Sequence, residues 1–244
     1  MDAGPQRAAY DAVHPGFGEG LGYTTEPDNI APGFSAYVDI MTGHCPFLRP
    51  SLQRGLTRWL RYETYAQPHQ LYDLQREIFA AAVEHMEILR DQPRSRPSSD
   101  GVLLCDNLAV GGVGVQDATA HRHVLAWPHW MLKTIYTPLG YMVGKFALHA
   151  QGADRRNTRV PPVPFSFLSL RVAVRRTDPR FLHETPHIAE QLAAAHDHGQ
   201  HPFARVPELA GIPLSRCALR IPECYQRVRA WARAQIPPEA GCSC

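Results

Sequence analysis

Two segments of alternating apolar residues constrain the fold of this chain more than any other feature of its sequence. In residues 165–175 apolar side chains alternate with small or charged ones: Leu168, Leu170, Val172 and Val174 against Ser169, Arg171, Ala173 and Arg175. Side chains of a β-strand point to opposite faces in turn, so the segment predicts a strand with a buried face and an outer face carrying two arginines. Residues 141–149 predict a second strand, with Met142, Phe146 and Leu148 on a core face and His149 ending the opposite face.

Helical spacing of apolar residues recurs elsewhere in the chain. Residues 71–89 carry an amphipathic stripe, and residues 51–60 place Leu52, Leu56, Trp59 and Leu60 after Ser51, a good helix N-cap. Helices are also expected at about 121–136, with an interruption near Pro128, at 187–198, and from Pro222 to about 235, and a short strand is expected at 102–109. The pattern predicts an α+β domain with a central, largely antiparallel sheet flanked by helices.

Length and composition favour one folded domain. The 244 residues are 44% hydrophobic and 20% charged, which is the ordinary range for a chain that buries a core. Residues 1–33 are rich in Gly and Pro without periodicity, so we expect an extended arm that packs on the domain or on a second copy in a homodimer. Residues 34–236 form the expected domain, and residues 237–244 a flexible tail.

Charge and hydropathy exclude two classes of partner. A formal net charge of +2 argues against electrostatic binding of nucleic acid. No stretch approaches the run of about 18 apolar residues that a membrane helix needs, and the start of the chain lacks the apolar run of a signal peptide. We therefore expect a cytoplasmic protein whose partner is a small molecule, with its six cysteines reduced.

The segment His183-Glu-Thr-Pro-His187 matches the zinc-hydrolase pattern His-Glu-x-x-His, whose chemistry needs both histidines on one helical face. Pro186 would disrupt such a helix, whereas Thr185 and Pro186 suit the N-cap and first position of a helix that starts there. We therefore expect the match to be accidental.

Two segments far apart in the sequence suggest a different chemistry. Cys45-Pro46-Phe47 follows the irregular N-terminal part, and residues 144–156 read Gly-Lys-Phe-Ala-Leu-His-Ala-Gln-Gly-Ala-Asp-Arg-Arg before a Pro-rich turn and a Pro-Phe-Ser-Phe-Leu strand. This combination, over roughly residues 40–182, resembles the YqcI/YcgG family, whose hallmarks are an early Cys-Pro-Phe and a later Gly-x-x-His-Pro-type segment with trailing arginines. Ala150 stands where proline is usual. Members are haem-dependent oxidative enzymes of natural-product pathways, including N-oxygenases of amino-acid guanidines.

The resemblance implies a role for several residues. His149 would be the axial ligand of haem b, with Arg155 and Arg156 near the propionates and Phe146, Trp127 and Trp130 in an apolar pocket. Cys45 would be catalytic, structural or an alternative thiolate ligand, and Arg171 or Arg175 would hold a substrate carboxylate.

The expected function is that of a haem-dependent oxygenase or oxidase, a monooxygenase in the N-oxygenating case. It would use dioxygen or peroxide to oxidise a small amino-acid-like substrate. Two alternatives stay open: a haem carrier or sensor without turnover, and a structural dimeric subunit.

Overall fold

The computed structural model describes residues 23–64, 70–92, 98–112, 118–154, 156–195 and 199–236. Most of the predicted arm, Arg155 and the predicted tail therefore lie outside the described residues. The elements in chain order are η1 (Pro27–Asn29), α2 (Phe34–Met41), α3 (Leu48–Gln53), β1 (Thr57–Glu63), α4 (Leu71–Asp91), α5 (Ser98–Gly101), β2 (Cys105–Gly111), α6 (Ala118–Tyr136), η3 (Thr137–Leu139), β3 (Tyr141–Phe146), β4 (Phe167–Val172), η4 (Asp178–Leu182), α7 (Pro186–Ala194) and α8 (Leu214–Ala234).

A four-stranded sheet in the order β1-β2-β4-β3 forms the centre of the molecule. Strands β1 and β2 are parallel, whereas β4 is antiparallel to both β2 and β3. The prediction of an α+β fold with a largely antiparallel sheet is confirmed.

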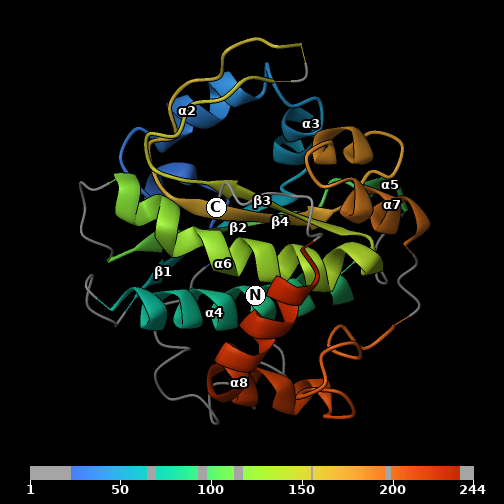
Figure 1. Ribbon diagram of the computed structural model, residues 1–244. Coiled ribbons are helices and arrows are strands. Elements are labelled where there is room, and N and C mark those ends of the chain that lie inside the picture. Colours follow the sequence, from blue (N-terminus) through green and yellow to red (C-terminus); the bar gives the residue numbers. More distant parts are fainter. Residues whose placement is uncertain are drawn as a thin grey trace.

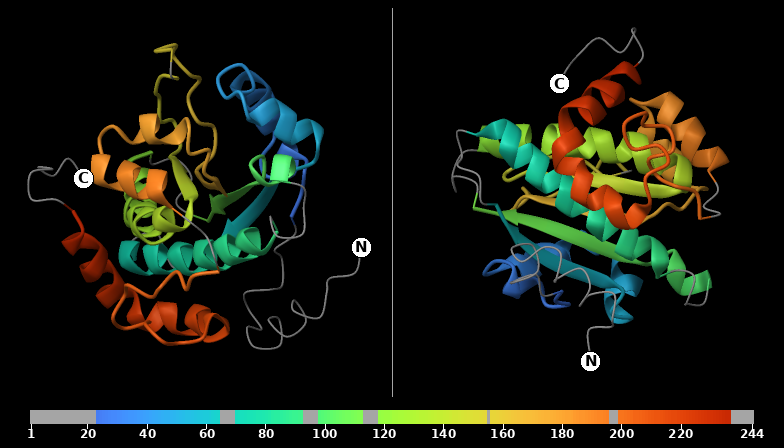
Figure 2. Two further views of the ribbon diagram at one scale, coloured as in Figure 1. Left: turned by 90° about the vertical axis from the view of Figure 1, so that its right-hand side faces the viewer. Right: turned by 90° about the horizontal axis from the view of Figure 1, so that it is seen from below.

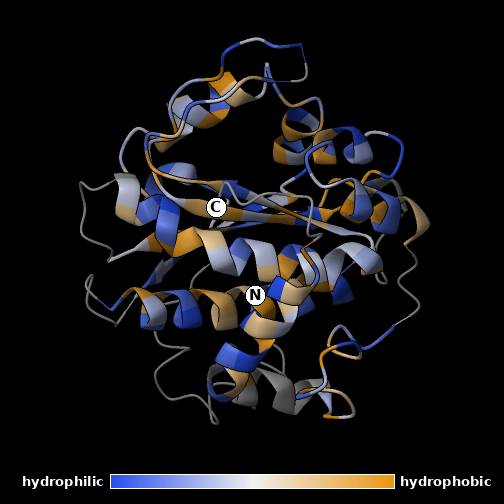
Figure 3. Cartoon of the chain, in the orientation of Figure 1, coloured by the Kyte–Doolittle hydropathy of each residue, from blue (hydrophilic) through white to orange (hydrophobic). Residues whose placement is uncertain are grey.

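Both faces of the sheet are covered. Helices α4, α6 and α8 lie on one side, where they bury Leu60, Leu108 and Leu168 of three strands in the larger hydrophobic core (Figure 1). Helices α2 and α3 and the segments 147–154 and 156–166 lie on the other side (Figure 2), where Phe34 and Tyr37 of α2 pack in a second core with Trp59 and Phe167. Apolar and hydrophilic residues are interleaved along α4, as its predicted amphipathic stripe requires (Figure 3).

The prediction of one helix over residues 51–60 is wrong. Helix α3 ends at Gln53, Gly55 adopts a left-handed φ of 62°, and β1 begins at Thr57. Trp59 and Leu60 are both buried, but in the two different cores on opposite faces of the sheet. Buried apolar residues occur on both faces of β1, so they do not show the strict alternation of a half-buried strand, and their spacing matches that of a helix by chance.

The two strands that the alternation predicted are shorter than expected. Strand β4 ends at Val172, so Leu168 and Leu170 enter the core as predicted but Arg175 lies beyond the strand in an exposed turn. Strand β3 ends at Phe146, and its core-facing residues are Tyr141 and Val143. The predicted assignment of the core face of β3 is therefore reversed. The opposite face is also apolar because Phe146 packs in the core with α2 and α3, and Met142 packs in a small core with η4 and α7.

The helices differ from prediction mainly at prolines. Helix α6 continues through Pro128, and α8 starts at Leu214, eight residues before Pro222. Helix α7 begins at Pro186 after Thr185, as predicted, so His183 and Glu184 lie outside it. None of the described helices has the length and apolar character needed to cross a membrane.

A buried polar cluster joins the start of the described chain to α4. Arg58 and Asp106 face each other across β1 and β2 and form two hydrogen bonds of 2.8 and 2.6 Å. The Cζ atom of Arg58 lies 4.1 Å from the centre of the Tyr23 ring, and the Tyr23 hydroxyl forms a hydrogen bond with Nδ1 of His85. Burial, together with the charge of Arg58, lowers the pKa of His85 to about 3.

This cluster should make the protein acid-sensitive. Because the pKa of His85 is below its ordinary value of 6.5, the unfolded chain takes up the proton first, and stability is lost as pH falls from 6.5 toward 3. Between pH 7 and pH 5 the loss should be about 2 kcal/mol. Urea unfolding at both pH values should show a smaller loss for His85→Gln, with the exposed His183→Gln as control. Identical pH dependence in all three proteins would contradict this role for His85.

Candidate active site

A cavity of about 450 Å³ lies between the sheet and the layer formed by α2, α3 and the segment 150–163. This volume is within the range of small-molecule and cofactor sites. The cavity is lined by residues from both segments that carry the family resemblance, Cys45-Pro46-Phe47 and residues 144–154. The exposed side chains of Val102 and Phe181 also line the cavity, so apolar side chains lie where the cavity meets the solvent.

The floor of the cavity consists of neighbouring residues on successive strands. One row across the sheet contains Thr57, Cys105, Arg171 and Met142, and the next row contains Trp59, Asn107, Ser169 and Gly144. The face is therefore polar in its middle strands, with aromatic rings at one side.

The aromatic side depends on a glycine. Phe146 stacks on Phe167 with ring centroids 4.4 Å apart and an interplanar angle of 6°, and Trp59 meets Phe167 edge to face at 5.4 Å. A Cβ atom on Gly144 would lie 2.9 Å from the Phe146 ring. The absence of a side chain at Gly144 thus allows Phe146 to fold back over the strand.

The polar part of the floor is built from neutral groups. The Cys105 thiol lies 3.3 Å from the Ser169 hydroxyl and donates weakly to the Asn107 carbonyl oxygen. Burial raises the pKa of the Cys105 thiol to about 11, so it is protonated at neutral pH. The Asn107 amide also donates to the Arg58 carbonyl at 3.2 Å.

Arg171 lines the cavity but is committed to an ion pair. Its two terminal nitrogens each donate to one oxygen of Asp178 at 2.8 Å, and Asp178 is fully buried. Burial disfavours the Arg171 charge, but the hydrogen bonds and charge of Asp178 outweigh that effect and hold the pKa of Arg171 above its usual value. The pair joins β4 to η4 and leaves little net charge at the floor.

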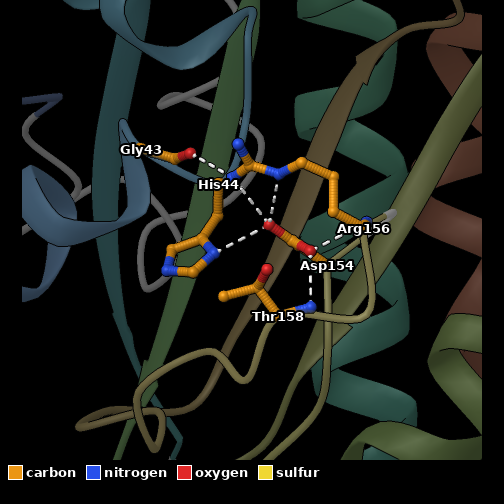
Figure 4. Close-up of polar contacts among 5 residues, drawn as sticks. All are labelled: Gly43, His44, Asp154, Arg156 and Thr158. Atoms are coloured by element: carbon orange, nitrogen blue, oxygen red, sulfur yellow. Dashed lines mark hydrogen bonds and ion pairs between the residues drawn. The ribbon is translucent and has the colours of Figure 1, made fainter.

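A histidine and an aspartate meet opposite the floor (Figure 4). His44 Nδ1 lies 3.1 Å from an oxygen of Asp154, and the two side chains are only 14% and 4% exposed. The backbone N–H of Thr158, the Arg156 side chain and His44 all bond to Asp154 and hold its pKa well below the usual range. Nδ1 of His44 donates to Asp154, and Nε2 has no hydrogen-bond partner among the described residues; in the tautomer with its proton on Nδ1, Nε2 carries a lone pair.

The structure brings some of the predicted site residues together and separates others. Cys45, Phe146 and Arg171 line the cavity. Arg156 lies outside it, where its exposed side chain bonds to Asp154 and to the Gly43 carbonyl. Arg175 is exposed and does not line the cavity.

His149 is not placed as the predicted ligand would be. It is exposed in a turn, with a left-handed φ of 58°, and it does not line the described cavity. Its backbone N–H bonds to the Val163 carbonyl at 2.7 Å, so the turn is fixed by main-chain contacts. The arrangement favours His44 over His149 as a ligand. Trp127 and Trp130 pack against the core on the opposite face of the sheet, so the prediction that they line this pocket is wrong.

Sequence reasoning missed His44, Asp154, Asn107 and Ser169. His44 directly precedes the Cys-Pro-Phe motif and Asp154 lies within the second motif segment, so their positions carried a signal. Their pairing over 110 residues is visible only in the structure. The described residues contain no group of three or more His, Cys, Asp or Glu side chains that could hold a metal ion.

Comparison with protein-family models, with curated proteins and with solved structures finds no match to this chain. The resemblance to the YqcI/YcgG family consequently rests on the two motif segments alone.

Proposed function

We propose that the protein is a haem-dependent oxidoreductase that uses dioxygen or peroxide to oxidise a small molecule in this cavity, with His44 as the iron ligand. The observation that carries the proposal is the His44–Asp154 pair on a largely apolar cavity lined by both motif segments. Metal-binding histidines in proteins characteristically donate their second ring N–H to a carboxylate, which fixes the tautomer and the ring orientation.

The donor set fits a haem. A neutral imidazole with a free Nε2 is a common axial ligand, and haem needs no further protein ligand on that side. Phe47, Leu48 and Phe146 supply apolar walls. The exposed Arg156, which bonds to Asp154 and to the Gly43 carbonyl, is a cation suited to a propionate. When bound, the haem would supply the redox chemistry with the oxidant.

The residues of the chain have separate tasks in this proposal. Asp154 holds the proton on His44 Nδ1 and so directs Nε2 away from itself. The apolar walls exclude water from the reacting molecule. Cys45 follows His44 and lines the same cavity, which makes it the alternative ligand as a thiolate.

A haem titration followed by absorption tests the ligand assignment. Purified protein should develop a Soret band at one haem per chain, and His44→Ala should lose it while keeping its circular dichroism spectrum. Asp154→Asn should weaken haem binding about 10–100-fold, because the ligand loses its supporting carboxylate. His149→Ala is the matched control and should bind as the parent protein does.

Four outcomes would contradict the proposal or part of it. Loss of the band in His149→Ala but not in His44→Ala would restore the ligand expected from the sequence. Loss only in Cys45→Ser would indicate thiolate ligation. A stoichiometric band without oxidant-dependent consumption of any substrate would indicate a carrier or sensor, and no band in any of the proteins would exclude haem.

A further inference from the structure

We propose that the floor of the cavity recognises an uncharged hydrogen-bonding group of the substrate, such as an amide, and that it discriminates against free carboxylates and ammonium groups. This inference rests on the proposed function only in identifying the bound molecule as the substrate. It replaces the expectation that Arg171 holds a substrate carboxylate.

Arg171 supplies the guanidinium that lines the floor. Both terminal nitrogens already bond to the buried Asp178 at 2.8 Å, and one also bonds to the Val172 carbonyl. Asp178 in turn accepts the backbone N–H of Val174. A substrate carboxylate would have to compete with a bidentate partner that is preorganised and fully buried, so it gains little from this arginine.

Asn107 and Ser169 at the floor retain hydrogen-bonding capacity. An Asn side chain has two N–H donors and two carbonyl lone pairs. Asn107 uses one donor for the Arg58 carbonyl and one lone pair for the Cys105 thiol, which leaves one donor and one acceptor on a side chain at the buried floor. Ser169, directly opposite Asn107 across the strands, adds a hydroxyl. A neutral group that both donates and accepts matches this pair.

The charged residues Lys145 and Asp154 do not provide a counter-charge for a ligand at the floor of the cavity. Lys145 alternates with Gly144 and Phe146 along β3, so its side chain leaves the strand on the opposite face. Asp154 is bonded to Arg156 and His44 on the other side of the cavity. An isolated charge on the ligand would therefore lose its hydration at the floor without gaining a counter-charge.

The aromatic rings beside Asn107 indicate which kind of group the substrate carries next to its neutral polar end. Trp59 lies beside Asn107 in the same row, and Phe167 and Phe146 form the next row. An aromatic or otherwise apolar body attached to a neutral polar end fits this arrangement, and 3-phenylpropanamide is a simple probe with both parts.

Calorimetric and ligand-observed NMR titrations of the full chain test the inference with three matched probes. They are 3-phenylpropanamide, 3-phenylpropanoate and 3-phenylpropylamine. The amide should bind at least about tenfold more tightly than either charged analogue, because the floor offers hydrogen bonds but no free charge. Equal or tighter binding of the carboxylate would overturn the proposal.

Variants of Asp178 and Asn107 separate the two structural reasons for the preference for an amide, which are the neutralised Arg171 and the hydrogen-bonding groups of Asn107. Asp178→Asn removes the counter-charge of Arg171 and should strengthen binding of the carboxylate roughly tenfold or more while changing amide binding little. Asn107→Leu should weaken amide binding roughly three- to tenfold. Thr57→Val is the matched control, because Thr57 lines the same cavity but its hydroxyl is already paired with Ser51 at 2.6 Å, and it should leave amide binding unchanged. Equal effects of Asn107→Leu and Thr57→Val would overturn the role of Asn107 even if Asp178→Asn does not fold.

These titrations are independent of iron. A protein that forms no Soret band but prefers the amide would contradict the haem proposal and keep this one. A haem-binding protein without preference among the probes would do the reverse.

Discussion

Asp178→Ala should lower the free energy of unfolding by about 3–5 kcal/mol, since removing one partner of a buried ion pair leaves the other charge uncompensated. Asp178 is completely buried, receives two hydrogen bonds from Arg171 and accepts the Val174 backbone N–H. The variant thus loses the contacts that tie the end of β4 to η4. Urea unfolding at pH 7 measures the change.

An exposed ion pair provides the control for Asp178→Ala. Asp73 and Arg76 lie 3.2 Å apart on the surface of α4, and Asp73→Ala makes the same change in charge. It should cost less than about 1 kcal/mol, because exposed pairs are well solvated. Replacing both partners of the buried pair, in the double variant Arg171→Met/Asp178→Ala, should restore part of the stability that Asp178→Ala loses. Equal costs for Asp178→Ala and Asp73→Ala would contradict the structural role of the buried pair.

Phe34→Ala should also cost about 3–5 kcal/mol, through lost burial and the cavity left behind. Phe34 has no exposed surface and contacts three rings: Trp59 at 4.7 Å, and Tyr37 and Phe167 at 5.8 Å. Its contacts with Trp59 and Phe167 attach α2 to the sheet. Chemical unfolding monitored by tryptophan fluorescence gives the measurement.

The matched control lies on the same helix. Ile40 is 53% exposed, and Ile40→Ala should change the unfolding free energy by less than about 0.5 kcal/mol. Because α2 carries Tyr37, Val38 and Met41 of the cavity lining, Phe34→Ala should also weaken binding of the amide probe. A variant with parental stability would show that α2 is held by other contacts.

Local sequence patterns predict the α+β architecture where a helix or strand has one apolar face and one polar face. The stripe in residues 71–89 predicted α4, and the alternation around Leu168 and Leu170 predicted β4 and its core face. Thr185-Pro186 predicted the first turn of α7, because proline lacks the N–H that is unpaired there.

Local patterns failed where tertiary packing covered both faces. Strand β1 lacks the spacing of a half-buried strand, since the adjacent residues Trp59 and Leu60 are buried in different cores and the exposed Arg61 and Glu63 come only toward its end. Pro222 was expected to start a helix and instead lies within α8. The end of β3 was expected at His149, whereas the chain turns after Phe146 and is held there by the Val163 carbonyl.

The sequence by itself determined the fold class, the amphipathic faces of α4 and β4, and the two segments, around Cys45 and Phe146, that line one cavity. Only the tertiary structure decided which side chains work together there. His44 meets Asp154 across 110 residues, and Arg171, which alternation had placed on an outer face, is neutralised by Asp178 in the following turn. Periodicity reports which face a side chain occupies, whereas hydrogen bonds and ion pairs depend on how separate elements pack, and that information is not contained in the spacing of residues along the chain.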